Sequence, residues 1–327
     1  MVNTTKIILL SVIFLVYCRS SFSQEQGEIT IKDLEKVYPV YSIKSELKGS
    51  VADKLAYQIV PEVDFDPLKK EINKTVLYGL GGVALGTGLT IHFYQKNAWW
   101  ADQSRVFRIQ NDWDYALWID KIGHFYGTVL ISHGLSASLE AANVSSETSV
   151  IYGSLGAFLF QAYIEYEDGF GLEWGFSPGD FMSDFFGAMY PVAQYYVPYL
   201  NNFQFRASYY PKHLSGANPK TGHKHIIVDD YEGQKFWLSF KMKNLLPKDI
   251  AKYWPGFLQL SAGMGVRELD GSGGGIIDYY LAFDLDADYL PLSGSFGQFI
   301  KNTLNLWHFP MPGIRINNKT VFFAICY

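Results

Sequence analysis

Cysteine is nearly absent from this chain of 327 residues, which has only Cys18 and Cys326. The two form no C-x-x-C pair and no spacing that could hold a structural zinc ion. The sequence therefore excludes a fold that is stabilised by several disulfides. Positive charge is also scarce, because 27 Lys and Arg stand against 32 Asp and Glu, a net charge of −5. This balance argues against nucleic acid as a partner.

Two familiar enzyme patterns are missing as well. The chain has neither the H-E-x-x-H of zinc proteases nor the G-x-S-x-G elbow of serine hydrolases. No internal repeat of fixed period is present either, so a solenoid or propeller is excluded. Any chemistry in this protein must come from less familiar combinations of polar residues.

The first residues predict export. Lys6 precedes an apolar run over residues 7–17, which has the length of a signal-peptide core. Ser21 and Ser23 then provide the small residues of a cleavage site. We therefore predict a signal peptide over residues 1–23.

A polar lead-in over residues 24–74 follows the signal peptide. The alternative to cleavage after residue 23 is lipidation of Cys18, as in a lipoprotein. Bulky Tyr17 stands where lipidation normally requires a small residue, which favours simple cleavage. The mature chain would then keep Cys326 as its single cysteine and could form no internal disulfide.

Aromatic residues make up 17% of the chain, a share that is common in proteins that meet lipid at an interface. Residues 75–94 contain no charge and are about as long as a bilayer core is thick. Gly82 and Gly86 in this run form a G-x-x-x-G, which lets another helix approach closely. Three more apolar segments predict helices; they lie near residues 115–139, 148–164 and 180–200.

After residue 202 the pattern changes to alternating apolar and polar residues, as in antiparallel strands with two different faces. The segments FQFRASY, FWLSFKMK, LQLSAGMGVRE, YYLAFDLDADYL and TVFFAICY all show it. The sequence thus predicts an α+β fold, with about four apolar helices over residues 75–202 and about five antiparallel strands over residues 203–327.

Three arrangements at a membrane remain open. The helices could lean on a membrane, they could span the inner membrane, or the strands could form an outer-membrane barrel. Spanning helices would leave the lysine-rich lead-in outside, against the positive-inside rule. About five strands are too few for a closed barrel in lipid. We favour membrane association, with envelope lipid as the partner.

The stretch DKIGHFYG places charged residues in an apolar helix. Asp120 and His124 are four residues apart and share a helix face. The simplest interpretation is an ion pair that fixes helix packing, although a carboxylate that orients a histidine also suits a metal ligand or a general base. We interpret Lys121, one step round the helix, as a lysine that reaches the membrane interface.

Acidic residues recur in the next two predicted helices. Glu165 ends one of them, and a solvated cluster with its acidic neighbours is the simplest interpretation. Asp180 belongs to an S-P-G-D helix start. Asp184, one turn further, is flanked by phenylalanines and is the strongest candidate for a buried functional acid. A set that could converge on a divalent metal or perform acid/base chemistry consists of Asp120, His124, Glu165 and Asp184.

Two pieces of this sequence resemble the YfiM-like family of predicted periplasmic lipoproteins, a domain of unknown function: DKIGHFYG and GFSPGDFMSDFFG. DDYEGQKFWLSF, YYLAFDLD and HFPMPGI resemble its longer members in Bacteroidetes-type bacteria. The helical part is also distantly similar to VanZ-like membrane proteins. The resemblance implies a place in the cell envelope and no particular reaction. Its motif positions are Asp120, Lys121, His124, Asp180 and Asp184.

We therefore predict an exported, membrane-associated protein of the cell envelope that faces the periplasm and has a structural or interaction role. One alternative is a hydrolase or transferase acting on envelope lipid or glycan, with His124 as base, Asp120 as its orienter and Asp184 as a further candidate. Another alternative is a metal-binding envelope module; a pair of histidines at His223 and His225 is a weaker metal candidate. The sequence identifies no cofactor and no protein partner.

The segment LAFDLDADYL predicts which face of the sheet is dry. Its apolar residues share one face and its acids share the other: Leu281, Phe283, Leu285 and Tyr289 against Asp284, Asp286 and Asp288. Because aligned carboxylates repel one another, we expect the acidic face to be wet and the apolar face to pack on helices or lipid. On this basis Asp286→Asn changes the free energy of unfolding by less than ~1 kcal/mol. Phe283→Ala should cost ~3 kcal/mol or more.

Overall fold

A computed structural model describes residues 71–97, 99–100, 106–172, 174–213, 227–317 and 321–327. The predicted signal peptide, Cys18 and most of the polar lead-in lie outside the described residues, and so do His223 and His225. The chain divides into two compact units after Lys69, and the second unit contains every described residue.

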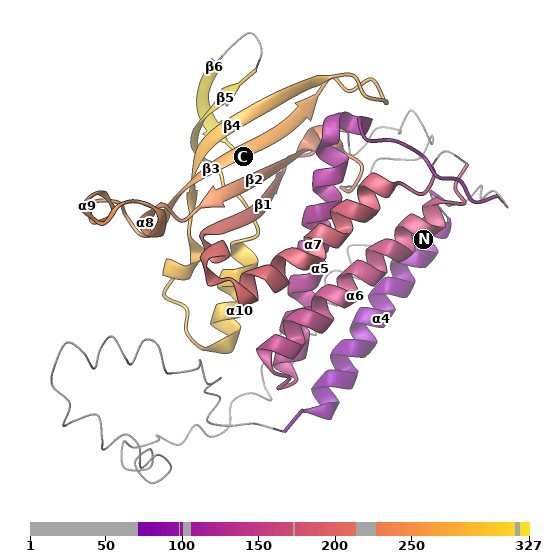
Figure 1. Ribbon diagram of the computed structural model, residues 1–327, viewed down its shortest axis with the longest axis horizontal. Coiled ribbons are helices and arrows are strands. Elements are labelled where there is room, and N and C mark those ends of the chain that lie inside the picture. The colour runs from indigo at the N-terminus through magenta and orange to yellow at the C-terminus, as the bar shows by residue number, and fades with distance from the viewer. Residues whose placement is uncertain (1–70, 98, 101–105, 173, 214–226, 318–320) are drawn as a thin grey trace. The chain divides into compact units, whose positions relative to one another are not determined.

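In the described part of the chain, the four predicted long helices come first and pack beside one another (Figure 1). They are α4 (Lys74–Lys96), α5 (Ile119–Ala141), α6 (Ser146–Asp168) and α7 (Pro178–Tyr196). The predicted helix start at α7 is present, because the side chain of Ser177 accepts a hydrogen bond from the backbone N–H of Asp180. Pro178 occupies the first position of the helix, where its missing N–H costs nothing.

Glycines bring α5, α6 and α7 into close contact. A Cβ added to Gly187 on α7 would collide with the backbone oxygen of Phe125 on α5, and one added to Gly153 on α6 would collide with Ser136. Among the described residues the G-x-x-x-G of α4 has no such role, because nothing lies within 4 Å of a Cβ at Gly82 or Gly86. Within the described chain, α4 is the helix with the length and apolar composition of a membrane span.

A six-stranded antiparallel sheet follows, with its strands paired in the order of the chain. The strands are β1 (Phe203–Tyr209), β2 (Gln234–Phe240), β3 (Leu258–Arg267), β4 (Ile276–Leu285), β5 (Met311–Ile316) and β6 (Val321–Cys326). The predicted α+β order is confirmed, but the predicted count of strands omitted β5. That strand contains Pro312 and Gly313, residues that weaken the strand pattern in the sequence.

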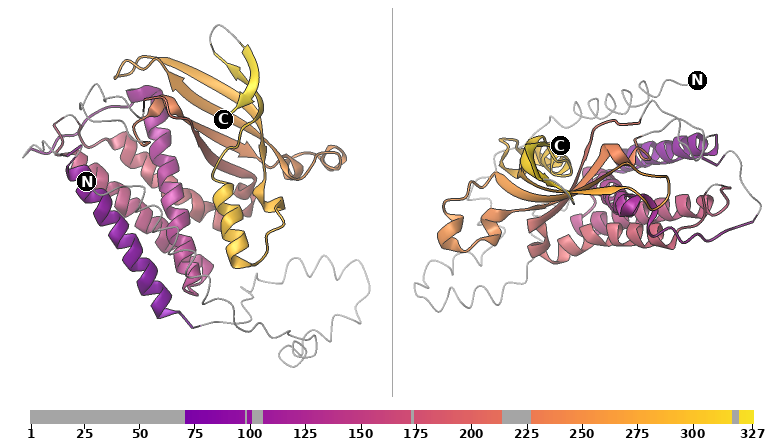
Figure 2. Two further views of the ribbon diagram at one scale, coloured as in Figure 1. Left: turned by 180° about the vertical axis from the view of Figure 1, so that it is seen from behind. Right: turned by 90° about the horizontal axis from the view of Figure 1, so that it is seen from above.

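Three shorter helices were also not predicted: α8 (Met242–Leu245), α9 (Lys248–Ala251) and α10 (Gly294–Leu304). Of these, α10 affects the sheet most, because the chain leaves it along the outer edge of β1. The backbone N–H of Ala207 donates to the carbonyl of Leu306 at 3.0 Å, and His308 N–H donates to the carbonyl of Ala207 at 2.9 Å. The sheet therefore curls (Figure 2), and residues 306–308 close its first edge.

The inside of this curl is polar and buried, so the prediction that the acidic face is wet is wrong. Asp284 is fully buried and Asp286 is 5% exposed, whereas Leu281, Phe283 and Leu285 are 37–40% exposed. The carboxylates do not form the repelling row that the sequence suggested, because β4 ends at Leu285 and the acids are paired with cations: Asp284 with Arg206, and Asp286 and Asp288 with Lys241. The changes in the free energy of unfolding predicted for Asp286→Asn and Phe283→Ala assumed the opposite burial, so they no longer apply.

The other face of the sheet is apolar, and α5 covers only its first strands (Figure 2). Ile119 and Tyr126 of α5 pack in a buried cluster with Phe236 and Val266. Each such buried side chain contributes roughly 1.5–3 kcal/mol. On the distant strands the same face stays open, and Phe323 on β6 is 84% exposed.

Candidate functional site: a charge cluster between three helices

Charged side chains from three helices meet where α5, α6 and α7 come together. All six residues that the sequence singled out take part: Asp120, Lys121 and His124 from α5, Glu165 from α6, and Asp180 and Asp184 from α7. The carboxylates and the lysine are each less than a tenth exposed. Asp112, from the loop before α5, joins them and was missed by the sequence analysis. We call these seven residues the charge cluster.

Lys121 joins three acids in one half of the cluster. Its Nζ lies 2.9 Å from Asp112 Oδ2, 3.0 Å from Asp120 Oδ2 and 3.1 Å from Asp180 Oδ1. The lysine is 3% exposed, so it points inward and does not reach an interface as we expected. Burial alone would lower the pKa of Lys121, but the surrounding carboxylates, led by Asp120, raise it above its usual value.

His124 joins the acids of the other half. Its Nδ1 lies 3.2 Å from Asp184 Oδ1 and 3.7 Å from Glu165 Oε1. The same Asp184 oxygen accepts hydrogen bonds from Thr128 Oγ1 at 3.0 Å and from Gln161 Nε2 at 3.1 Å. Asp184 is therefore the acid that orients the imidazole.

The pair predicted from sequence, Asp120 and His124, is present as a longer contact. Asp120 Oδ1 and His124 Nε2 are 3.9 Å apart. Tyr231 holds the same Asp120 oxygen by donating a hydrogen bond of 2.7 Å. This tyrosine belongs to a short 3-10 helix over Tyr231–Gly233 that leads into β2, so it connects the sheet to the cluster. Its only signal in the sequence was its position in the DDYEGQKFWLSF piece.

The cluster contains more acidic than basic side chains, and its buried groups have pKa values that differ from their ordinary ones. Burial would lower the pKa of His124, but Asp180, Asp184 and Asp120 raise it well above the ordinary value. Burial raises the pKa of Glu165 to about 9. Burial, together with the charge of Asp120, raises the pKa of Asp180 to about 7. At neutral pH we therefore expect an imidazolium at His124 and a protonated Glu165.

Ser177, the N-cap residue of α7, holds two acids of the charge cluster by hydrogen bonds. Its backbone N–H donates to Glu165 Oε2 at 3.2 Å, and its hydroxyl donates to Asp112 Oδ1 at 2.6 Å. Glu165 is 2% exposed, so the solvated acidic loop suggested by the sequence is not what forms here. The residue that caps α7 thus also positions Glu165 of α6 and Asp112 of the loop before α5.

A strained turn sets the point at which α5 begins. Ala116, Leu117 and Trp118 have φ values of 48°, 54° and 75°, a left-handed conformation that costs non-glycine residues about 1–2 kcal/mol each. Ala116 N–H donates to the carbonyl of Ser272 at 2.9 Å, which ties the turn to the β3–β4 connection. The turn places Asp120 in the first turn of α5, and strain of this kind is often found beside functional sites.

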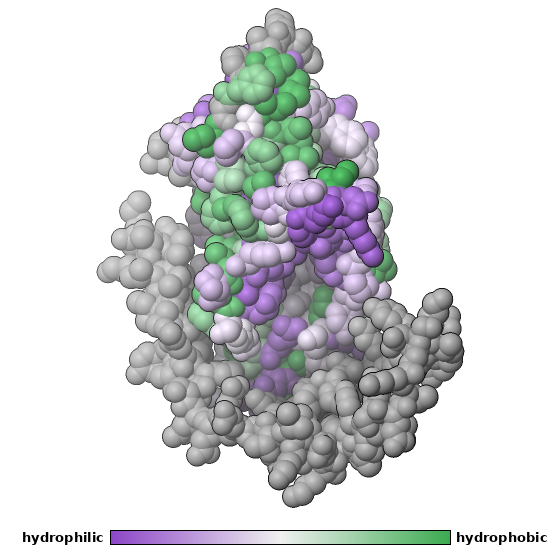
Figure 3. Space-filling model, turned by 90° about the vertical axis from the view of Figure 1, so that its left-hand side faces the viewer, coloured by the Kyte–Doolittle hydropathy of each residue, from purple (hydrophilic) through white to green (hydrophobic). Residues whose placement is uncertain are grey.

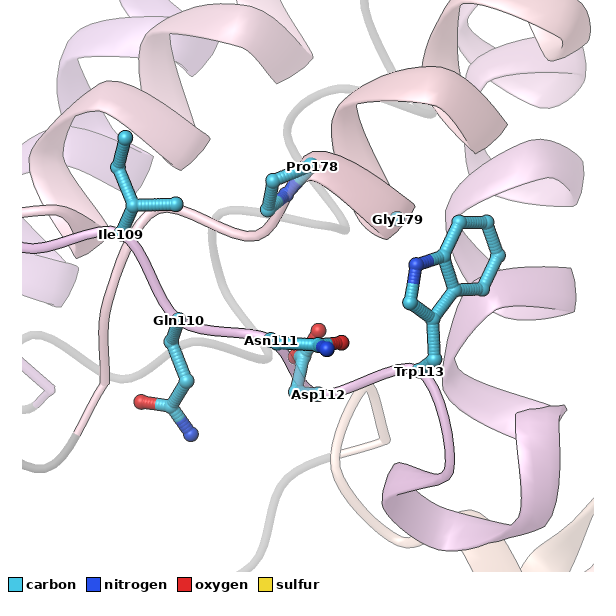
Figure 4. A pocket seen from close by; sticks show the side chains of 7 residues that line it. All are labelled: Ile109, Gln110, Asn111, Asp112, Trp113, Pro178 and Gly179. Carbon is cyan, nitrogen blue, oxygen red and sulfur yellow. The ribbon is translucent and has the colours of Figure 1, made fainter.

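A pocket of about 300 Å³ opens beside the cluster (Figure 4). Residues 109–113 form one side, and Pro178 and Gly179 at the start of α7 form the other. Asp112 belongs to both the pocket and the cluster. Gly179 leaves room for the lysine, since a Cβ there would lie 3.1 Å from Lys121 Cε. Of the charge cluster, Asp112 lines the pocket, and it lies 2.9 Å from the buried Lys121 Nζ.

Two overlapping sets within the cluster have the spacing of metal ligands, and both use His124. One set adds Asp120 and Asp180, and the other adds Glu165 and Asp184; in each, the three ligand atoms lie within 4.8 Å of one another. The first set meets Nε2 of the imidazole and the second meets Nδ1. Nitrogen and carboxylate donors of this kind suit Zn²⁺ or Mn²⁺.

A second group of buried charges lies inside the curled sheet. Asp284 Oδ1 lies 3.2 Å from Arg206 Nη1, and its Oδ2 lies 2.9 Å from His308 Nδ1. Neutral side chains complete the group, which we call the sheet network: Ser239 and Ser261 donate to Asp284, and Gln259 and Asn305 accept from Arg206. The sequence predicted a wet face at Asp284 and gave no indication of His308.

The family model described as predicted periplasmic lipoprotein (DUF2279) matches residues 111–196. The matched segment runs from the pocket to the end of α7 and contains every residue of the charge cluster. The match confirms the expected likeness to predicted periplasmic lipoproteins over this segment. It also confirms that the chain is exported to the cell envelope and faces the periplasm. No curated protein and no solved structure matches the chain.

Proposed function

We propose that this envelope protein is membrane-associated and has a structural or interaction role. The supporting observation is that charged side chains are buried in this protein while large apolar side chains are exposed. Glu165, Asp184, Arg206 and Asp284 are at most 2% exposed, while large apolar side chains such as Phe323 lie on the surface. Water-soluble proteins seldom bury so many charged groups, whereas proteins in contact with lipid turn such groups inward.

The exposed apolar side chains lie on both parts of the fold. On the helices they include Leu85 on α4 at 66% exposure and Leu159 on α6 at 58%. On the sheet, Ile325 of β6 is 63% exposed, and Figure 3 shows hydrophobic side chains gathered around the β5–β6 hairpin. Hydrophilic side chains gather lower on that face, over α8 and α9 (Figure 3). Scattered apolar residues are ordinary, but extended apolar surfaces favour contact with lipid or with another protein.

The structural role falls to the charge cluster. Each long helix of the family segment contributes acids, and Lys121 and His124 connect them across the helix contacts. Removing one partner from such a group leaves a buried charge unbalanced, at a cost of about 3–5 kcal/mol. The cluster therefore specifies one arrangement of α5, α6 and α7.

Flotation of the purified chain with liposomes tests membrane association. We expect the protein to float with the lipid at high salt, because apolar contact does not depend on screening. The double variant Phe323→Ser with Ile325→Ser should float less, and the matched pair Lys248→Ser with Lys252→Ser on α9 should float as the wild type does. A wild-type protein that stays with the soluble fraction would contradict the proposal.

Two substitutions separate a structural role from catalysis. His124→Gln and Asp184→Asn should lower the amount of folded protein in the envelope, since each breaks a buried contact. Glu140→Gln, at an exposed acid on the same helix, is the control. Normal abundance together with the phenotype of a deletion strain would instead support an enzyme.

The pocket beside Asp112 favours a second candidate function, a hydrolase or transferase acting on envelope lipid or glycan. In that case the raised pKa of His124 suits a proton donor better than the general base that the sequence suggested. Lys121, next to the pocket, could bind an anionic group of the substrate. Turnover of a lipid or glycan substrate that is lost in His124→Gln but kept in Glu140→Gln would support this function.

A further inference from the structure

One side of the His124 ring faces a gap between two acids. Nε2 lies 3.9 Å from Asp120 Oδ1 and 4.0 Å from Asp180 Oδ1, distances too long for a hydrogen bond. Asp180 is 4% exposed, yet its Oδ1 makes no hydrogen bond with any described residue; Lys121 Nζ, 3.1 Å away, gives it an ion pair only. A buried carboxylate oxygen in this state normally has a bound water or ion.

The groups behind this gap are already fixed. Asp184 orients the ring from its Nδ1 side, and Thr128 and Gln161 hold that acid in turn. Asp120 accepts a hydrogen bond from Tyr231 on the oxygen that faces the ring. A histidine whose far nitrogen is held by a carboxylate, with its near nitrogen directed toward other acids, is the arrangement found around metal ligands.

The charge of the cluster also favours a further cation. Its acids are Asp112, Asp120, Glu165, Asp180 and Asp184, and its bases are Lys121 and His124. Even with a proton on Glu165, the remaining carboxylates outnumber the two basic side chains. Lys121 pairs with Asp120 Oδ2 and with both oxygens of Asp180, so it offsets only part of this excess. Asp120 Oδ1 and Asp180 Oδ1 face the imidazole.

We propose that Asp120, His124 and Asp180 bind one divalent transition-metal ion, for which Zn²⁺ is the best probe. Bonds of about 2.0–2.2 Å to the three facing atoms would need only small movements of the side chains. The ion would replace the proton on Nε2 and join α5 to α7. This inference rests on the structural role proposed above, because the metal would stabilise the same helix contacts.

The overlapping set formed by His124, Glu165 and Asp184 fits a metal less well. Asp184 Oδ1 already accepts hydrogen bonds from Thr128 and Gln161 and lies within hydrogen-bond distance of His124 Nδ1, so this side of the ring is occupied. Nε2, on the other side, has no hydrogen bond to either acid. The first set also lies nearer the pocket, through Asp112 and Lys121. An ion could therefore reach it without opening the helices.

Elemental analysis of the full chain after metal removal tests the site. The detergent-purified protein is stripped with a chelator, dialysed against Zn²⁺ and analysed alongside its variants. We expect about one Zn²⁺ per chain and a higher Tm with zinc than without it. Asp180→Asn should abolish both effects, while Glu165→Gln and the sheet variant Asp286→Asn should keep both. Loss of zinc in Glu165→Gln with retention in Asp180→Asn would overturn the assignment in favour of the other set.

The outcomes for metal and for structure can be separated. Circular dichroism and gel filtration of the stripped wild type report folding without metal. A folded wild type that binds no zinc overturns the metal site and leaves the structural role intact. Should Asp180→Asn fail to fold, Co²⁺ loaded into the wild type decides, because the absence of its visible absorption bands for bound nitrogen and oxygen ligands would overturn the proposal.

Discussion

The charge cluster and the sheet network both bury charged side chains, but they balance the charge differently. In the sheet network one carboxylate, Asp284, meets Arg206 and His308, and neutral side chains supply further hydrogen bonds, while Arg206 Nε and His308 Nε2 have none among the described residues. In the charge cluster, acids outnumber Lys121 and His124, and one acid oxygen has no hydrogen bond among the described residues. A balanced network can serve structure alone, whereas an unbalanced one beside a pocket can accept a cation.

The two regions should therefore respond differently to the loss of an acid. Asp284→Ala removes the only carboxylate of the sheet network and leaves Arg206 buried without it, so it should cost about 3–5 kcal/mol of the free energy of unfolding. Urea unfolding of the purified chain, followed by tryptophan fluorescence, measures this. Asp288→Ala, at an acid whose side chain is 39% exposed and paired with Lys241, should cost less than ~1 kcal/mol. Equal costs at the two sites would show that Asp284 is not the centre of a buried network.

Helix packing around the charge cluster can be disturbed without touching a charge. Gly187→Ala forces a methyl group against the backbone of Phe125 and should cost about 1–3 kcal/mol by separating α5 from α7. Gly82→Ala, on the open side of α4, should be neutral or stabilise by up to ~1 kcal/mol, because alanine favours helix. Thermal unfolding of both variants checks this, and a mild Gly187→Ala would mean that the helices are not in close contact.

The pH dependence of stability should have opposite signs in the two regions. Burial raises the pKa of Glu165 to about 9, above its ordinary value of 4.5. The folded protein therefore holds a proton that the unfolded chain releases, and stability falls as the pH rises from about 4.5 toward 9, by up to ~1.4 kcal/mol per pH unit. Burial would raise the pKa of Asp284, but His308 and Arg206 lower it, so its contribution is lost as the pH falls below about 4.

Unfolding curves across this pH range, recorded with a chelator present, test both signs. Glu165→Gln removes the titratable group at this position, so the variant should lose less stability than the wild type as the pH rises. Asp284→Asn should flatten the loss on the acid side and leave the alkaline side unchanged. A wild-type protein that grows more stable between pH 5 and pH 8 would contradict the protonated state expected of Glu165.

The smallest effects are expected at the outer face of the sheet. Phe323→Ala, at a side chain that is 84% exposed, should change the free energy of unfolding by less than ~0.5 kcal/mol. Phe283→Ala, at 38% exposure, should cost about 1 kcal/mol, well below the value expected for a core residue. Unfolding in detergent measures both, and a cost above ~3 kcal/mol at Phe283 would place it in a core after all.

The helices and their acids could be predicted from sequence because both signals are local. Apolar runs predicted the long helices, the S-P-G-D pattern predicted the start of α7, and Asp184 stood out as an acid among phenylalanines. The sequence also grouped four of the residues that meet at the cluster, Asp120, His124, Glu165 and Asp184, but it assigned Lys121 to the membrane interface and Asp180 to the start of a helix. It could not reveal Asp112 or Tyr231, because their contacts depend on a strained turn and on how the sheet meets α5.

The polarity of the sheet could not be predicted for a different reason. Alternation shows that a strand has two faces, but it does not show which of them the protein encloses. That depends on Arg206, which comes from β1, and on His308, which follows α10. The apolar face of the first strands does pack on α5, but the polar face is enclosed as well, and the rule that apolar residues face inward does not predict that.

The closure of the sheet at β1 also has a consequence for the order of folding. Arg206 contacts the carbonyl of Trp307, which lies 101 positions later in the chain. Contacts between such distant residues form slowly. The helices of the charge cluster and the first strands leave the export machinery before residues 306–308 do, and until then the edge of β1 and the guanidinium of Arg206 have no partners from that segment. The last part of the chain is therefore needed to complete the edge of β1 and the sheet network, and we expect this step to come late in folding.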